Sequence, residues 1–163
     1  APYIYQGEEL GREDVDVPAD QRQDPIWSRS AGTVVGRDGC RSPIPWSSDA
    51  PGFGFTTGQP WLPFGTDASE RSAQLQSDDP ASTLSFYRAA LKARREHARG
   101  DLAWLGSPEG AMAFRRGDLM CVLNTSATPF AVPGELVLAS DPTVIGAGGS
   151  VTVPADTAVW VTA

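Results

Sequence analysis

The chain has 163 residues, which is enough for one domain, or for one small domain and part of another. Its hydrophobic content of 40%, with five tryptophans, is typical of a packed globular protein rather than a disordered one. Thirteen basic against twenty acidic side chains give a net charge of −7. This charge disfavours nucleic acid and anionic membranes as partners, because both attract clustered lysine and arginine.

The chain begins with an apolar, strand-like run. Residues 2–6 read Pro-Tyr-Ile-Tyr-Gln and are followed by Gly7, a pattern that predicts a short parallel strand buried on both faces. A natural N-terminus rarely starts inside such a strand, so we expect the C-terminal piece of a longer polypeptide, or an incomplete sequence. Glu8 and Glu9 point to opposite sides of an extended chain, so at most one of them can face a site.

No convincing helix or long strand is predicted between residues 10 and 78. Pro, Gly, Ser and Asp recur there, yet the segment is too rich in aromatic residues for a disordered linker. We therefore expect an ordered loop, and ordered loops of this length are usually functional. Its aromatic side chains either pin the loop to a scaffold or stack on sugar rings. They are Trp27, Trp46, Phe53, Phe55, Trp61 and Phe64.

One segment stands out within this loop. Residues 36–46 read Gly-Arg-Asp-Gly-Cys-Arg-Ser-Pro-Ile-Pro-Trp. Arg37 and Arg41 flank Asp38, and the two prolines that follow stiffen the chain as it reaches Trp46. Such a segment holds polar groups in place without regular structure around them. From this segment alone, a turn with a surface ion pair is the alternative interpretation.

A helix and then a set of strands are predicted next. Asp79 and Pro80 suit the N-cap and first position of a helix, residues 82–97 follow a helical pattern, and Gly100 ends it. After Gly100, short alternating segments separated by Gly and Pro turns predict a small antiparallel β-sandwich with no cluster of titratable residues. The predicted strands are residues 102–105, 112–116, 119–124, 130–132, 136–139, 150–153 and 157–161.

The first hundred residues thus predict one α/β unit: strand, very long loop, helix. In α/β barrels and doubly wound sheets, the loop that follows the carboxyl end of a strand carries binding and catalytic residues. Residues 36–46 therefore lie on the functional side of the predicted scaffold. A single unit of this kind cannot bury its own faces, so we expect earlier units.

Three segments carry a resemblance to a known family. Residues 2–11, Pro-Tyr-Ile-Tyr-Gln-Gly-Glu-Glu-Leu-Gly, resemble the segment on the eighth barrel strand of the α-amylase superfamily, glycoside hydrolase family 13. Residues 23–27 (Gln-Asp-Pro-Ile-Trp) and 36–46 are similar to its α-glucosidase and oligo-1,6-glucosidase branch. The resemblance implies that residues 1–100 form the C-terminal end of a (β/α)8 TIM barrel: strand 8, a long substrate-side loop and the last helix. It also implies that residues 101–163 form a C-terminal β-sandwich domain.

The resemblance implies a retaining α-glucosidase that acts on maltose-like or isomaltose-like oligosaccharides. Such enzymes use an Asp nucleophile, a Glu acid and base, and a third carboxylate that stabilises the transition state. In this family all three lie on earlier strands, and none of their motifs is present here. We therefore expect no catalytic residue in this chain, and no activity from it alone.

Substrate-binding residues can be carried over from the family motif. Arg37 matches the first arginine of Arg-Asp-x-x-Arg, which reaches the nonreducing-end glucose site and pairs with a carboxylate from elsewhere in the barrel. Arg41 matches the second arginine, near the same site. Asp38 and Trp46 are expected to structure the loop. Glu8 is a second-rank candidate, which orients the strand end by hydrogen bonding.

Two other functions stay open: a noncatalytic carbohydrate-binding or structural module, and a glucosyl-transferring relative such as a trehalose synthase or sucrose isomerase. The form Gln6-Gly7-Glu8-Glu9 is unlike that of trehalose synthases, and Pro45 replaces a Gln frequent in the family, which leaves linkage preference open. The expected partners are an oligosaccharide substrate and the N-terminal barrel segment, with no cofactor or metal. Cys40 and Cys121 fit neither a zinc pattern nor a disulfide framework, so a cytoplasmic location is expected.

Overall fold

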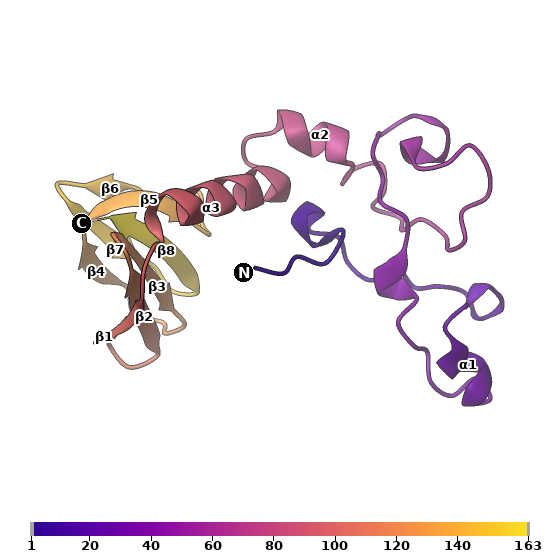
Figure 1. Cartoon of the computed structure of the whole chain (residues 1–163), viewed down its shortest axis with the longest axis horizontal. Helices are drawn as coiled ribbons and strands as arrows, with labels where there is room; N and C mark the ends of the chain where they lie inside the picture. The colour runs from indigo at the N-terminus through magenta and orange to yellow at the C-terminus, as the bar shows by residue number, and fades with distance from the viewer. Residues whose placement is uncertain (1, 163) are drawn as a thin grey trace. The chain divides into compact units, whose positions relative to one another are not determined.

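The computed structural model describes residues 2–162, which divide into two compact units (Figure 1). The first unit runs to Tyr87 and the second from Arg88, so the division falls inside helix α3, Thr83–His97. Among the described residues, strands occur only after α3, whereas the residues before it form short helices joined by long irregular stretches.

The strand predicted over residues 2–6 is not present. Residues 2–5 form no strand, and the chain turns at Gly7 into the 3-10 helix η1, Glu8–Leu10. A strand needs a hydrogen-bonded neighbour, and no other strand lies in the described residues of this unit. Of the predicted strand, long loop and helix, the described residues therefore form the loop and the helix.

The long loop contains more helical structure than predicted. Besides the single turns η2 (Ala19–Gln21), η3 (Gly39–Arg41) and η4 (Pro51–Gly54), it forms helices α1 (Pro25–Arg29) and α2 (Ala73–Asp78). Each α-helix begins at a capping side chain: Asp24 accepts from the N–H of Ile26, and Ser72 accepts from the N–H of Leu75. These helices are too short for the apolar periodicity that identifies longer ones.

Buried polar side chains hold this loop together. The Arg12 guanidinium, 5% exposed, donates to the Pro43 carbonyl at 2.6 Å and to Asp67 at 3.2 Å, so it joins segments far apart in sequence. Gln76 joins α2 to two further elements: its Nε2 donates to the Leu10 carbonyl at 2.8 Å, and its Oε1 accepts from the Leu84 N–H at 3.1 Å. The irregular unit is therefore ordered by side-chain hydrogen bonds to backbone groups.

Helix α3 begins later than predicted. Asp79 accepts from the N–H of Ala81 in a separate turn, and the helix starts at Thr83. Ser82 supplies the cap instead, since its hydroxyl accepts from the Ser85 N–H at 3.1 Å.

The second unit forms the predicted antiparallel sheets. One sheet has the order β1-β2-β3-β8-β5 and the other β4-β7-β6, and all seven predicted strands are confirmed. The short strand β6 was not predicted. The bounds are β1 Leu102–Leu105, β2 Ala111–Arg116, β3 Leu119–Asn124, β4 Phe130–Pro133, β5 Glu135–Ala139, β6 Gly146–Ala147, β7 Ser150–Val153 and β8 Thr157–Thr162.

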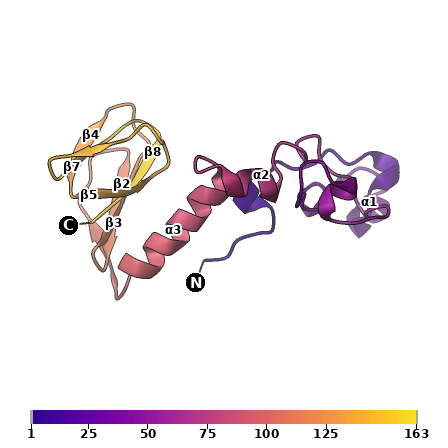
Figure 2. The same cartoon turned by 90° about the horizontal axis from the view of Figure 1, so that it is seen from above.

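A valine-rich core lies between the two sheets. Val122, Val159 and Val161 of the larger sheet pack with Val151 and Val153 of the smaller one. Figure 2 shows β4 and β7 side by side, with β2, β3 and β5 beneath them. β-Branched side chains suit these positions because they pack densely on a pleated surface. Within residues 2–162, no helix combines the length and the apolar character needed to cross a bilayer.

Candidate functional site

The candidate site is built on the turn that contains η3. Asp38, 1% exposed, lies at its centre, where its Oδ2 accepts from the N–H groups of Gln23 at 2.6 Å and Asp24 at 2.8 Å. Two backbone donors on one carboxylate oxygen fix residues 23–24 against residues 36–41. Both of these hydrogen bonds of Asp38 are to backbone N–H groups, so the side chain stabilises the turn.

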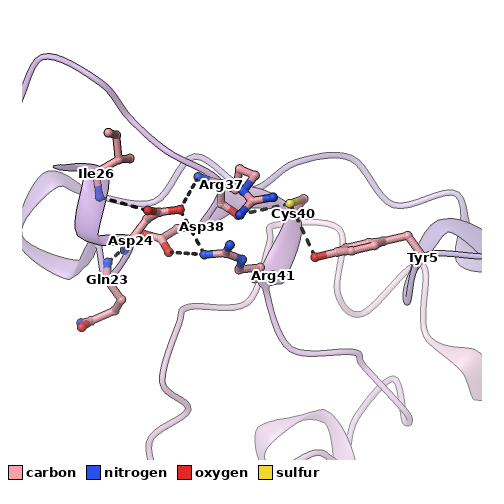
Figure 3. Close-up of polar contacts among 8 residues, drawn as sticks. All are labelled: Tyr5, Gln23, Asp24, Ile26, Arg37, Asp38, Cys40 and Arg41. Atoms are coloured by element: carbon pink, nitrogen blue, oxygen red, sulfur yellow. Dashed lines mark hydrogen bonds and ion pairs between the residues drawn. The ribbon is translucent and has the colours of Figure 1, made fainter. Parts of the chain in front are cut away.

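Asp24 is the second carboxylate of the turn, and no role for it was predicted from the sequence. Its Oδ1 accepts from the Ile26 N–H, and its Oδ2 accepts from both the Arg37 N–H and the Arg41 guanidinium, each at 3.1 Å (Figure 3). The N–H groups of Ile26 and Arg37 lower the pKa of Asp24, and the charges of Arg41 and Arg37 act in the same direction. Asp24 therefore stays ionised and available to both arginines.

The two arginines of the turn are in different states. Arg41 lies between two carboxylates, 3.1 Å from Asp24 and 3.9 Å from Asp38, with its side chain 30% exposed. Arg37 is exposed, and its guanidinium makes no hydrogen bond or ion pair within the part of the chain that the structure describes. Of these two arginines, Arg37 is therefore the one whose guanidinium has no hydrogen bond within the described residues, and a guanidinium in this state can bind a carboxylate or sugar hydroxyls.

Glu8 lies apart from this charged turn and is bonded to its own unit. Its Oε1 accepts from the Tyr87 hydroxyl at 2.7 Å, and its Oε2 accepts from the Tyr5 N–H at 3.1 Å. The Tyr87 hydroxyl, then the Tyr5 N–H, lower the pKa of Glu8, while the same bond to Glu8 raises the pKa of Tyr87 to about 12. Both oxygens are therefore engaged, and Glu8 ties η1 to α3.

Two hollows beside the turn have several lining residues in common. One, of about 250 Å³, has Glu8, Arg12 and Cys40 in its lining, and the other, of about 460 Å³, has Arg41 and Trp46. The shared wall is formed by Tyr5, Gln6, Cys40, Ser42 and Ile44. The Trp46 side chain is exposed, with 54% of the residue accessible, and its backbone N–H donates to the Phe53 carbonyl at 2.9 Å. A guanidinium beside aromatic surface offers the two kinds of contact that sugars accept: hydrogen bonds to hydroxyls and stacking on the ring.

The described residues hold no group of three or more His, Cys, Asp and Glu side chains placed to bind a metal ion. The candidate site presents the guanidinium groups of Arg37 and Arg41, the backbone-bonded carboxylates of Asp24 and Asp38, and the aromatic side chain of Trp46.

Residues 1–100 match the catalytic domain of α-amylase, and the chain belongs to the α-amylase family. It is 34% identical over 130 residues to a probable α-glucosidase from Rhizobium meliloti, covering 76% of this chain and 23% of that protein. It is 30% identical over 172 residues to an oligo-1,6-glucosidase from Halalkalibacterium halodurans, covering 88% of this chain and 30% of that protein. The chain thus spans less than a third of these relatives.

Solved structures give the same family relationship. The α-glucosyl transfer enzyme XgtA superposes with a TM-score of 0.74 at 33% identity, covering 97% of this chain and 32% of that enzyme. The trehalulose synthase MutB from Pseudomonas mesoacidophila superposes with a TM-score of 0.75 at 25% identity, covering 99% of this chain and 35% of that enzyme. Both chains are about three times as long as this one.

Proposed function

We propose that this chain is part of a retaining α-glucosidase that releases terminal α-linked glucose from maltose-type or isomaltose-type oligosaccharides. The relatives named α-glucosidase and oligo-1,6-glucosidase support this reaction class. In the proposed enzyme the nucleophile and the acid and base lie on earlier barrel strands. This chain supplies part of the substrate-pocket wall and no catalytic carboxylate.

The proposed architecture is the end of a (β/α)8 barrel followed by a β-sandwich. Residues 2–6 become the eighth strand once earlier barrel segments provide a hydrogen-bonded neighbour, and α3 is the last barrel helix. The family match ends at residue 100, which supports a division into domains at 1–100 and 101–163. The partners proposed are the preceding barrel segments and the oligosaccharide. Cys40 and Cys121 are both free thiols, which suits a cytoplasmic location.

One observation carries the proposed site: the Arg37 guanidinium makes no hydrogen bond or ion pair within residues 2–162, and its backbone N–H is held by Asp24. Its proposed role is to bind hydroxyls of the nonreducing-end glucose and a carboxylate from an earlier part of the barrel. Arg41 and Trp46 line the adjacent hollow and form its wall, with Asp38 structuring the loop. Glu8, the second-rank candidate among the substrate-binding residues, is proposed to orient the strand end through its hydrogen bond with Tyr87.

Hydrolysis of maltose and isomaltose by the full-length protein tests the proposed reaction. We expect glucose to be released initially as the α-anomer, because a retaining enzyme preserves the configuration of the bond it breaks. Proton NMR of the first turnovers distinguishes the two anomers. Release of the β-anomer, or no cleavage of either disaccharide, would contradict the proposal.

Glucosyl transfer is the second candidate, because the two solved structures described above are named an α-glucosyl transfer enzyme and a trehalulose synthase. Transfer and hydrolysis share the glycosyl-enzyme and differ in whether a sugar or water attacks it. Product analysis of the full-length protein on maltose and on sucrose separates them. Free glucose as the main product supports the α-glucosidase, whereas longer oligosaccharides or an isomerised sucrose support the transferase.

A further inference from the structure

The carboxylate of Asp24 divides its two oxygens between two tasks. Oδ1 accepts from the Ile26 N–H and so begins α1. Oδ2 accepts from the backbone of Arg37 and from the side chain of Arg41, residues 13 and 17 positions further along the chain. The Asp24 side chain is 12% exposed; its bond to the Arg41 guanidinium is partly buried, and its bonds to the N–H groups of Ile26 and Arg37 lie at the surface. A single oxygen thus joins the start of α1 to both arginines of the candidate site.

Asp38 fixes the same turn from the opposite side. Its Oδ2 accepts from the N–H of Asp24 itself, and its Oδ1 lies 3.9 Å from Arg41 Nη1 and has no hydrogen bond within the described residues. The two carboxylates together balance the charge of Arg41 and of one further cation. That further cation is Arg37, whose charge acts on Asp24 but whose guanidinium makes no hydrogen bond or ion pair in the part of the chain that the structure describes.

We propose that Asp24 is a positioning residue for the glucose site: it fixes the Arg37 backbone and the Arg41 guanidinium, so that the Arg37 guanidinium is held ready for substrate. This inference rests on the function proposed above. Asp24 is not assigned a contact with sugar. Its effect on turnover passes through Arg37. The backbone of Arg37 is fixed before substrate binds, so the residue loses less conformational freedom on binding.

The bonds of Asp24 Oδ2 to the Arg37 N–H and the Arg41 guanidinium are called the clamp below. The substitution Asp24→Asn breaks the clamp but keeps the helix cap. Asparagine caps helices as well as aspartate does, so its carbonyl oxygen can still accept from the Ile26 N–H. Its NH2 group replaces Oδ2, which places a donor against the two donors of Arg37 and Arg41 and removes the negative charge. Asp20→Asn is the matched control, because Asp20 is an exposed carboxylate of the same loop with no contact to either arginine.

A double-mutant cycle in the full-length protein tests the proposal through kcat/KM on maltose. We expect Asp24→Asn to lower kcat/KM about tenfold in the parent but less than about twofold in an Arg37→Ala background, because the group it positions is then absent. A second measurement is hydrogen exchange of residues 36–41, which we expect to be faster in Asp24→Asn than in the parent or in Asp20→Asn.

Each outcome of these two measurements either supports or overturns the proposed role of Asp24. A loss of the same size in both backgrounds would mean that Asp24 acts on folding in general, and unchanged exchange would mean that it holds no clamp; either result overturns the proposal. If Arg37→Ala by itself leaves kcat/KM unchanged, the assignment of Arg37 to the glucose site fails, and the purpose given to the clamp fails with it. The hydrogen-exchange result still shows whether the clamp exists.

Discussion

Arg37 and Arg41 belong to one motif, yet their surroundings differ. The family resemblance selects both from the sequence, but it does not show that Arg41 lies between two carboxylates while the guanidinium of Arg37 has no protein partner among the described residues. Asp24 was missed for a physical reason. Its Asp-Pro pair signals a helix cap, whereas its bonds to both arginines depend on how the chain folds back over more than ten residues.

The bond between Glu8 and Tyr87 predicts a measurable pH window. It lowers the pKa of Glu8 from 4.5 and raises that of Tyr87 from 10.0 to about 12. The stability that Glu8 contributes is present above pH 4.5 and is lost as the pH falls through its lowered pKa. The part from Tyr87 is present below pH 10.0 and is lost as the pH rises toward about 12. Tyr87→Phe should therefore lower Tm between these limits.

The Tm difference should shrink outside that window in the full-length protein. Thr152→Val is the control, because it removes an exposed hydroxyl from β7 in the second unit and should change Tm by the same amount at every pH. A Tm difference for Tyr87→Phe that is constant from pH 3 to pH 11 would mean that the hydroxyl stabilises the protein without Glu8.

At the scale of elements, the sheets were easier to predict than the helices. Strand β3 is a short apolar run between turn residues, and its partner β8 alternates buried and half-buried residues, as expected for strands that cover a core. The start of α3 was misplaced because Asp79-Pro80 is a good cap signal in isolation, whereas Ser82 and Gln76 provide the caps that are used. Which of two capping sequences is used depends on what packs against them.

Gln76 is predicted to be among the stabilising polar residues of the first unit. It is 8% exposed and satisfies the carbonyl of Leu10 and the N–H of Leu84. Gln76→Met fills a similar volume but leaves both backbone groups without that partner, so we expect a loss of about 2–3 kcal/mol in the free energy of unfolding.

Urea denaturation of the full-length protein measures this loss. Gln74→Met is the matched control, since Gln74 is exposed two residues earlier in the same helix and makes one long bond, 3.4 Å, to the Ser48 N–H. Equal effects of the two substitutions would show that the buried amide contributes nothing specific.

At the scale of the whole molecule, the family and the C-terminal sheets follow from the sequence, but the barrel does not. Residues 2–6 have the composition of a buried strand, yet strand formation depends on a neighbouring strand, and the described residues of their unit contain none. The chain covers 32% of XgtA and 35% of MutB, so the segments that would pair with residues 2–6 in a barrel have no counterpart in its described residues. The family resemblance predicts Arg37 and Arg41 as site residues, whereas their contacts with Asp24 and Asp38 are known only from the fold.

The most direct test of the central claim is kcat/KM of the Arg37→Ala variant of the full-length protein on maltose, beside Arg29→Ala, which removes an exposed arginine from the same loop. Charge-assisted hydrogen bonds contribute roughly 1.5–3 kcal/mol each, so losing the Arg37 guanidinium should lower kcat/KM about a hundredfold while Tm is unchanged. Arg29→Ala should leave both values at the parent level. Equal kcat/KM for Arg37→Ala and the parent would contradict the assignment of residues 37–46 to the glucose pocket.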